Sequence, residues 1–202
     1  MNTVRRLFWH ELRLFASLGL WIARRQHGTT GGGLAFGYTH GQGAVMFGFA
    51  FVCVVETVGM SVLLRDLPTL HAVVFLLDVY GVVIVVGQHA ASVVRPHVLD
   101  SGTLRIRRAA HVDLRIPLET IASVRRELRM THERADGELD LAVGAQTTVT
   151  VQLAEPVIHF TFLGRRRDIG VVRFHADDAD HLVHELTRAR NALSSSPEDL
   201  PA

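Results

Sequence analysis

The sequence has no lysine and only one cysteine, and both scarcities limit what the protein can be. All 21 basic residues are arginines, and 20 acidic residues bring the formal net charge to +1. A chain so close to neutral has no overall positive field, so we expect no nucleic-acid partner. Cys53 has no second cysteine to pair with, which excludes an intramolecular disulfide.

Motifs for catalysis and for cofactor binding are also missing. The chain has no Gly-x-Ser-x-Gly, no His-Glu-x-x-His, no phosphate-binding loop and no dinucleotide fingerprint. His181 and His184 share one face of a predicted helix, but a metal site needs at least one more ligand, for which Asp177 is a nearby candidate. The pattern favours a solvated helix face, and we expect no enzyme, no cofactor and no metal.

What the sequence does have is two long apolar runs, Gly43–Leu64 and Leu70–Gly87, joined by the short connector Arg65–Thr69. Helices of this length reach roughly 27–33 Å, about the thickness of the hydrocarbon core of a membrane. Neither run has a polar face of the kind that soluble helices show. Residues 43–94 are therefore predicted to form a transmembrane hairpin, and the alternative is a buried helical pair in a soluble core.

Each run carries one carboxylate near its middle. Glu56 lies nine residues before the connector and Asp78 nine residues after it, so a hairpin would place both at the same depth. Carboxyl groups in apolar surroundings favour their neutral form, and two close together resist double ionisation. Two hypotheses follow: a proton or ion site within an oligomer, or a structural hydrogen bond that fixes hairpin register or dimer packing.

The distribution of arginine predicts the orientation of the hairpin. Arginines gather on both outer sides of the two runs, at positions 5, 6, 13, 24 and 25 before the first and at positions 95, 105, 107 and 108 after the second. The connector has only Arg65, with Asp66 beside it. By the positive-inside rule both termini are cytoplasmic, and the protein is a multi-pass protein of the cell (inner) membrane.

Residues 1–27 are predicted to form an amphipathic helix. Apolar residues recur there at spacings of three and four, and Trp9 and Trp21 suit the headgroup level. This indicates a helix lying on the inner leaflet and attracted to anionic lipid; the alternative is a helix packed on the cytoplasmic domain. Residues 28–42 form a glycine-rich linker in this interpretation, and residues 194–202 a disordered tail.

Residues 95–193 have the pattern of a β domain followed by a helix. Seven short alternating runs are predicted as strands: Thr103–Arg107, His111–Ile116, Thr120–Leu128, Glu138–Val143, Thr147–Leu153, Val157–Leu163 and Ile169–Phe174. Asp177 or Asp178 can then cap a C-terminal helix. The predicted fold class is an α+β membrane protein in which a seven-stranded barrel or sandwich is closed by that helix.

Several short motifs follow one another in an order that resembles a known family. They are Phe36-Gly37-Tyr38, Val55-Glu56, Arg95-Pro96-His97, Leu104-Arg105-Ile106-Arg107, Ile116-Pro117-Leu118, Leu163-Gly164-Arg165-Arg166 and Phe174-His175-Ala176-Asp177-Asp178. Over about residues 36–190 the chain resembles the actinobacterial small integral membrane proteins with a cytoplasmic bacterial PH-like domain. The resemblance implies that fold and membrane attachment. The family has no established activity, so it implies no functional residues.

Two arginine clusters are candidates for contact with headgroups or with a partner. The first comprises Arg105, Arg107 and Arg108, and the second Arg165, Arg166 and Arg167. On a domain held at the inner leaflet they would face anionic phospholipid headgroups; the alternative is ordinary solvated charge. The sequence thus predicts a non-catalytic, membrane-anchored binding or scaffold module that engages the bilayer, a protein partner or a second copy. The alternative function is a small subunit of a transport or ion-handling complex that uses Glu56 and Asp78.

Overall fold

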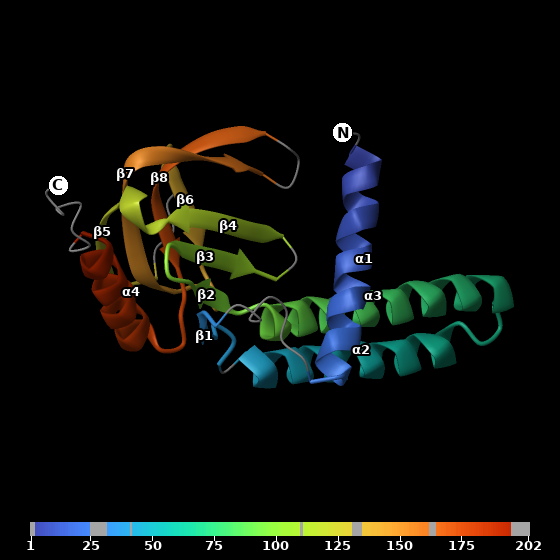
Figure 1. Ribbon diagram of the computed structural model, residues 1–202. Coiled ribbons are helices and arrows are strands. Elements are labelled where there is room, and N and C mark those ends of the chain that lie inside the picture. The colour runs from blue at the N-terminus through green and yellow to red at the C-terminus, as the bar shows by residue number, and fades with distance from the viewer. Residues whose placement is uncertain are drawn as a thin grey trace, which may run out of the picture.

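A β domain stands at one end of the molecule, and a long helical hairpin extends away from it (Figure 1). The computed structural model describes residues 3–24, 32–40, 42–109, 111–130, 135–161 and 165–194. The predicted tail lies outside the described residues apart from Ser194, and so do residues 28–31 and 41 of the predicted linker.

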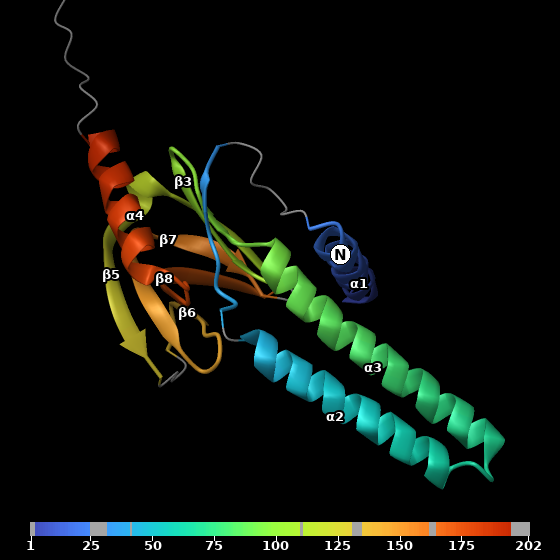
Figure 2. The same ribbon diagram turned by 90° about the horizontal axis from the view of Figure 1, so that it is seen from below.

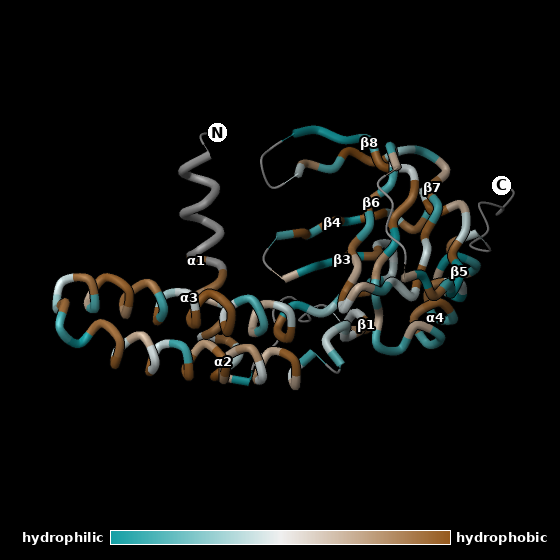
Figure 3. Tube along the Cα trace, turned by 180° about the vertical axis from the view of Figure 1, so that it is seen from behind, coloured by the Kyte–Doolittle hydropathy of each residue, from teal (hydrophilic) through white to brown (hydrophobic). Residues whose placement is uncertain are grey.

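The hairpin consists of α2 (Gln42–Leu63) and α3 (Pro68–Val94). Both helices are long and apolar enough to cross a membrane, by length and composition. Their side chains are mostly exposed: α2 has no buried residue, and α3 buries only Gly87, Ala90, Ala91 and Val94 near its end. Figure 3 shows that hydrophobic residues predominate along both helices of the hairpin. A buried helical pair in a soluble core therefore does not describe this fold.

Both ends of the hairpin enter the same β-sheet. Strand β1 (Leu34–Phe36) precedes α2, strand β2 (His97–Leu99) follows α3, and the two pair antiparallel with Phe36 opposite His97. Strand β1 lies within the segment that the sequence predicted as a linker. The hairpin is therefore a long insertion between two neighbouring strands.

The chain between β1 and α2 is also held by a side chain from the far end of the domain. The carboxylate of Asp177 accepts hydrogen bonds from the backbone N–H groups of Thr39 (3.1 Å) and His40 (2.9 Å). The Asp177 N–H donates to the carbonyl of Gly37 (2.9 Å), and a Cβ at Gly37 would lie only 2.8 Å from Asp177 Oδ2. A larger residue at position 37 would push the Asp177 carboxylate away from the position in which it accepts these hydrogen bonds.

The β domain contains eight described strands in two sheets, so the prediction of seven is wrong. The first sheet has the order β1-β2-β3-β4, with β3 (Thr103–Arg108) and β4 (Val112–Pro117). The second has the order β5-β7-β8-β6, with β5 (Ile121–Arg129), β6 (Glu138–Leu141), β7 (Thr147–Phe160) and β8 (Arg166–Phe174). Strand β6 pairs parallel with β8, and the other pairs are antiparallel.

Helix α4 (Ala179–Ser194) packs on the apolar residues that the two sheets enclose. Asp178 caps it, because the His181 N–H donates to Asp178 Oδ1 (3.1 Å). Leu182 and Leu186 of α4 are fully buried against the sheets, in a cluster that includes Ile116, Val149 and Phe174. A short 3-10 helix, Leu118–Thr120, links β4 to β5.

Helix α1 (Thr3–Ile22) lies across the base of the hairpin. Figures 1 and 2 show it crossing α3 at a steep angle, nearly end-on in the second view. Leu14 packs on Ala91 of α3 and on Ala109 in the turn between β3 and β4. The helix therefore contacts both the hairpin and the β domain, while Leu12, Phe15 and Ile22 remain exposed.

Candidate functional site

Glu56 and Asp78 line one groove between α2 and α3. The groove has a volume of about 210 Å³ and is also lined by Cys53 and by apolar residues: Phe49, Leu77, Gly81, Val82 and Val85. The structure therefore places the two acids beside the same groove.

Among the described residues, no hydrogen bond joins Glu56 to Asp78. The Oδ2 atom of Asp78 is buried and has no hydrogen-bond partner there. Closer to the connector, His71 of α3 is hydrogen-bonded to Ser61 of α2 (3.1 Å). That contact links the two helices without the acids, which leaves the carboxyl groups available to a proton, a cation or a polar group from another helix.

In the first arginine cluster, the three side chains have different environments. Arg105 donates two hydrogen bonds to the carboxylate of Asp113, at 2.6 and 2.5 Å. These bonds raise the pKa of Arg105. Burial acts to raise the pKa of Asp113, but the bonds and charge of Arg105 outweigh it and lower that pKa. Arg105 is thus already engaged within the domain.

Arg107 is almost fully buried, and Arg108 is exposed. The Arg107 guanidinium donates to the carbonyl of Pro96 (3.5 Å), and burial lowers its pKa, helped by the charge of Arg105. Arg108, in contrast, has no carboxylate partner among the described residues. Of this cluster, Arg108 is the side chain best placed to bind a ligand.

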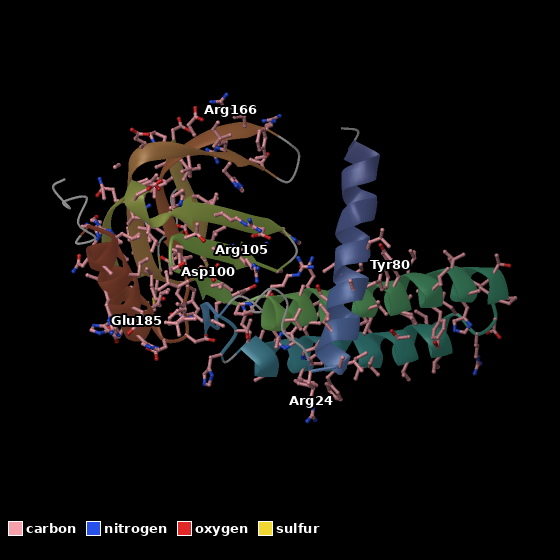
Figure 4. The ribbon with its side chains drawn as sticks, viewed as in Figure 1. Arg24, Tyr80, Asp100, Arg105, Arg166 and Glu185 are labelled. Atoms are coloured by element: carbon pink, nitrogen blue, oxygen red, sulfur yellow. The ribbon has the colours of Figure 1, made fainter. Side chains whose placement is uncertain are left out.

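The second cluster lies at the free end of the β7–β8 hairpin, well apart from Arg105 (Figure 4). Arg166 pairs with Asp168 at 3.3 Å, and Arg167 with Asp136 at 3.6 Å. On β7, Ile158 and Phe160 are 50% and 60% exposed. This end of the domain therefore presents both cationic and apolar side chains to the outside.

His97 lies in the centre of the domain, where both of its ring nitrogens are used. Nδ1 accepts a hydrogen bond from the Arg107 N–H (3.1 Å), and Nε2 donates to the carbonyl of His175 (3.0 Å). The rings of Tyr38 and Phe174 lie against it. Burial lowers the pKa of His97 to about 4, so it is neutral at physiological pH.

A cavity of about 390 Å³, which the sequence did not predict, lies where the hairpin meets the β domain. This junction cavity is lined by Tyr38, Gln42, Met46, Gln88, His89, Ser92, Arg108, Ala109, His111, Val112, Leu141 and Val143. The backbone at Ala109 has a positive φ of 47°, and its N–H donates to the Tyr38 hydroxyl (2.8 Å). That bond fixes the β3–β4 turn beside the cavity.

An apolar groove lies beside the junction cavity. Met46 and His89 line both, and the groove is completed by Trp21 of α1 with Phe47, Ala50, Val85 and Val86 of the hairpin. The sequence held one signal for this site: polar Gln88, His89 and Ser92 begin directly after the apolar run ends at Gly87. The segments that complete the site lie far apart in the chain.

The described residues contain no group of three or more histidine, cysteine or acidic side chains that could hold a metal ion. His181 instead lies edge-on against Phe36, with its ring 3.8 Å from Asp178.

Comparison with known proteins adds no relative. No family model, no curated protein and no solved structure matches this chain.

Proposed function

We propose that the protein is a non-catalytic, membrane-anchored binding module. In this proposal α2 and α3 span the cell membrane with both termini in the cytoplasm. The β domain is then held at the cytoplasmic leaflet, where it engages anionic lipid, a protein partner or a second copy. The observation that carries the proposal is an exposed apolar hairpin whose two ends are both built into one sheet.

A hairpin mounted in this way gives the domain a fixed orientation to the bilayer. Helix α1 crosses the hairpin at its base, and the ends of the β3–β4 and β7–β8 hairpins lie on the same side of the domain as α1 (Figure 1). With α1 along the leaflet, its exposed Leu12, Phe15 and Ile22 would meet lipid. Arg108 and Arg165 would meet headgroups.

A PH-like fold is the finer description that we propose for the β domain. It is supported by the seven strands and the C-terminal helix that follow the hairpin in the chain, with β1 as an addition from before it. A fold of this kind does not identify a ligand.

The test is the side of the membrane on which each loop lies. Cys53 is the only cysteine, so Cys53→Ala gives a background for single probes. Asp66→Cys lies in the exposed α2–α3 connector, and Ser101→Cys is its match in the exposed β2–β3 turn. We expect a membrane-impermeant maleimide to label Asp66→Cys on intact cells, and Ser101→Cys only after permeabilisation. The reverse pattern, or recovery of the chain in the soluble fraction, would contradict the proposal.

The alternative, a small subunit of an ion-handling complex, is favoured by the groove that Glu56 and Asp78 share. Replacing them together, Glu56→Gln with Asp78→Asn, removes both titratable groups and keeps their size. This function predicts a loss of proton- or cation-coupled transport with assembly intact. Unchanged transport and unchanged assembly would exclude it and leave the acids a packing role at most.

A further inference from the structure

We infer that the junction cavity binds the head of a phospholipid of net negative charge, and that the adjoining apolar groove holds part of an acyl chain. This inference rests on the proposed membrane anchoring and goes beyond it. Membrane contact requires only a surface, whereas here one lipid molecule occupies a defined site.

The charge of the cavity selects an anion. Its lining includes Arg108, His89 and His111 as well as the amides of Gln42 and Gln88, but no carboxylate, although the chain has 20 acidic residues. Guanidinium and amide N–H groups are donors that suit phosphate oxygens. A headgroup that carries its own cation would find no anionic partner in this lining.

The apolar groove beside the cavity favours an amphiphile. Met46 and His89 line both spaces, so a head in the cavity and an acyl chain in the groove would lie next to each other. The Nδ1 atom of His89 is buried there and has no hydrogen-bond partner among the described residues. A buried polar atom of this kind is normally satisfied, and a hydroxyl or ester group of a bound lipid would satisfy it.

The position along the hairpin matches the way lipids lie in a membrane. The cavity lies on the domain side of Gly87, where the apolar run of α3 ends, and the groove lies on the apolar side beside Val85 and Val86. A lipid in this site would therefore have its head and tail at the depths that the leaflet gives them. The cavity volume of about 390 Å³ is within the range of ligand pockets, about 300–1,000 Å³.

Trp21 provides a direct probe because it lines the groove. Trp9→Phe leaves Trp21 as the only tryptophan of the full chain. This variant protein is reconstituted into phosphatidylcholine nanodiscs. Small mole fractions of phosphatidylglycerol with brominated acyl chains are added, and quenching of Trp21 fluorescence is measured. We expect half-maximal quenching at a mole fraction about tenfold lower than for brominated phosphatidylcholine, as one charge-assisted hydrogen bond suggests.

Two variants test the two halves of the site. Arg108→Gln should remove most of the preference for phosphatidylglycerol. Arg188→Gln, the matched change on exposed α4, should leave it unchanged. Ala50→Leu fills the apolar groove without a change of charge, and should weaken quenching by both brominated lipids while the chain remains in the nanodisc.

The outcomes distinguish a failure of the lipid site from a failure of the proposed membrane anchoring. Equal quenching by the two lipids in an inserted protein would overturn the lipid site and leave the proposed anchoring intact. Competition by soluble glycerol phosphate would show that the site binds free phosphate esters, and this result would also overturn the inferred phospholipid site. A chain that does not enter nanodiscs would overturn the anchoring itself.

Discussion

His97 is a single residue whose chemistry follows from its two hydrogen bonds. Because Nε2 donates to the His175 carbonyl and Nδ1 accepts from the Arg107 N–H, the ring must be neutral with its proton on Nε2. A second proton on Nδ1 would face the Arg107 N–H and the nearby Arg107 side chain in a buried site. Burial and these neighbouring charges make the protonated ring unfavourable, which is why the pKa of His97 is as low as about 4.

This residue makes stability depend on pH. The unfolded chain binds a proton at His97 near pH 6.5, whereas the folded chain does so only near pH 4. Between these values the unfolded state binds more protons, so stability is complete above about pH 6.5 and falls as the pH is lowered. We expect a loss of about 3 kcal/mol across this window. The measurement is urea unfolding of the full chain in detergent, followed by circular dichroism.

His97→Gln is the control for this effect. Glutamine has an amide that can donate and accept hydrogen bonds but does not titrate. We expect the His97→Gln protein to be less stable overall, because the amide cannot reproduce the geometry of both imidazole hydrogen bonds. The dependence on pH between about 4 and 6.5 should become shallower by the His97 contribution. An unchanged pH slope in His97→Gln would show that other groups cause the acid sensitivity. His175, whose pKa burial also lowers, would then be the first of these.

At the residue scale, the sequence says more about where the acids of the hairpin lie than about the surroundings of Arg107. Glu56 and Asp78 line one groove, and each lies nine residues from the short connector. Alternation along β3 puts Arg105 and Arg107 on one face of the sheet. That alternation does not indicate which part of the chain covers this face. In the structure Pro96, at the end of the hairpin, accepts a hydrogen bond from Arg107, whose side chain is buried.

At the scale of elements, the strand count changed for two physical reasons. The predicted strand Thr147–Leu153 and the first part of Val157–Leu163 form one strand, β7, which ends at Phe160; residues 162 and 163 lie outside the described residues. Pro156 lies where the register with β8 shifts, between Gln152 and Val157. A missing N–H is tolerated at such an irregularity. Strands β1 and β2 have three residues each, too few for a periodic pattern, and they pair only because the hairpin returns the chain to its starting point.

Helix α4 shows the opposite case, in which local signals are enough. Its cap at Asp178 and its apolar spacing are both encoded within a few residues. Asp177, directly beside the cap, makes contacts that no local pattern encodes, because its partners Thr39 and His40 lie more than 130 residues away. Local capping and remote tethering thus come from adjacent aspartates.

At the scale of the whole molecule, the β domain is discontinuous in sequence. Phe36 and Tyr38, which precede the hairpin, are 5% and 2% exposed, and both contribute to the packing of the domain. Tyr38 also packs against His97 and accepts the Ala109 N–H. The folded unit therefore comprises residues 33–40 together with residues 96–194, and the hairpin is an insertion between them.

This arrangement predicts that the hairpin can be removed from the domain. Since Phe36 is opposite His97, replacing Gly41–Arg95 by a short glycine-serine linker should join β1 to β2 directly. We expect residues 33–40 linked to 96–194 to fold as a soluble domain. The fragment 96–194 alone should be less stable by at least about 3 kcal/mol, because it lacks two large buried aromatic side chains.

Neither version contains α1 or the hairpin, so the comparison isolates β1 and the segment after it. Chemical denaturation measures the difference, and equal midpoints with equal slopes would show that the domain boundary lies after the hairpin.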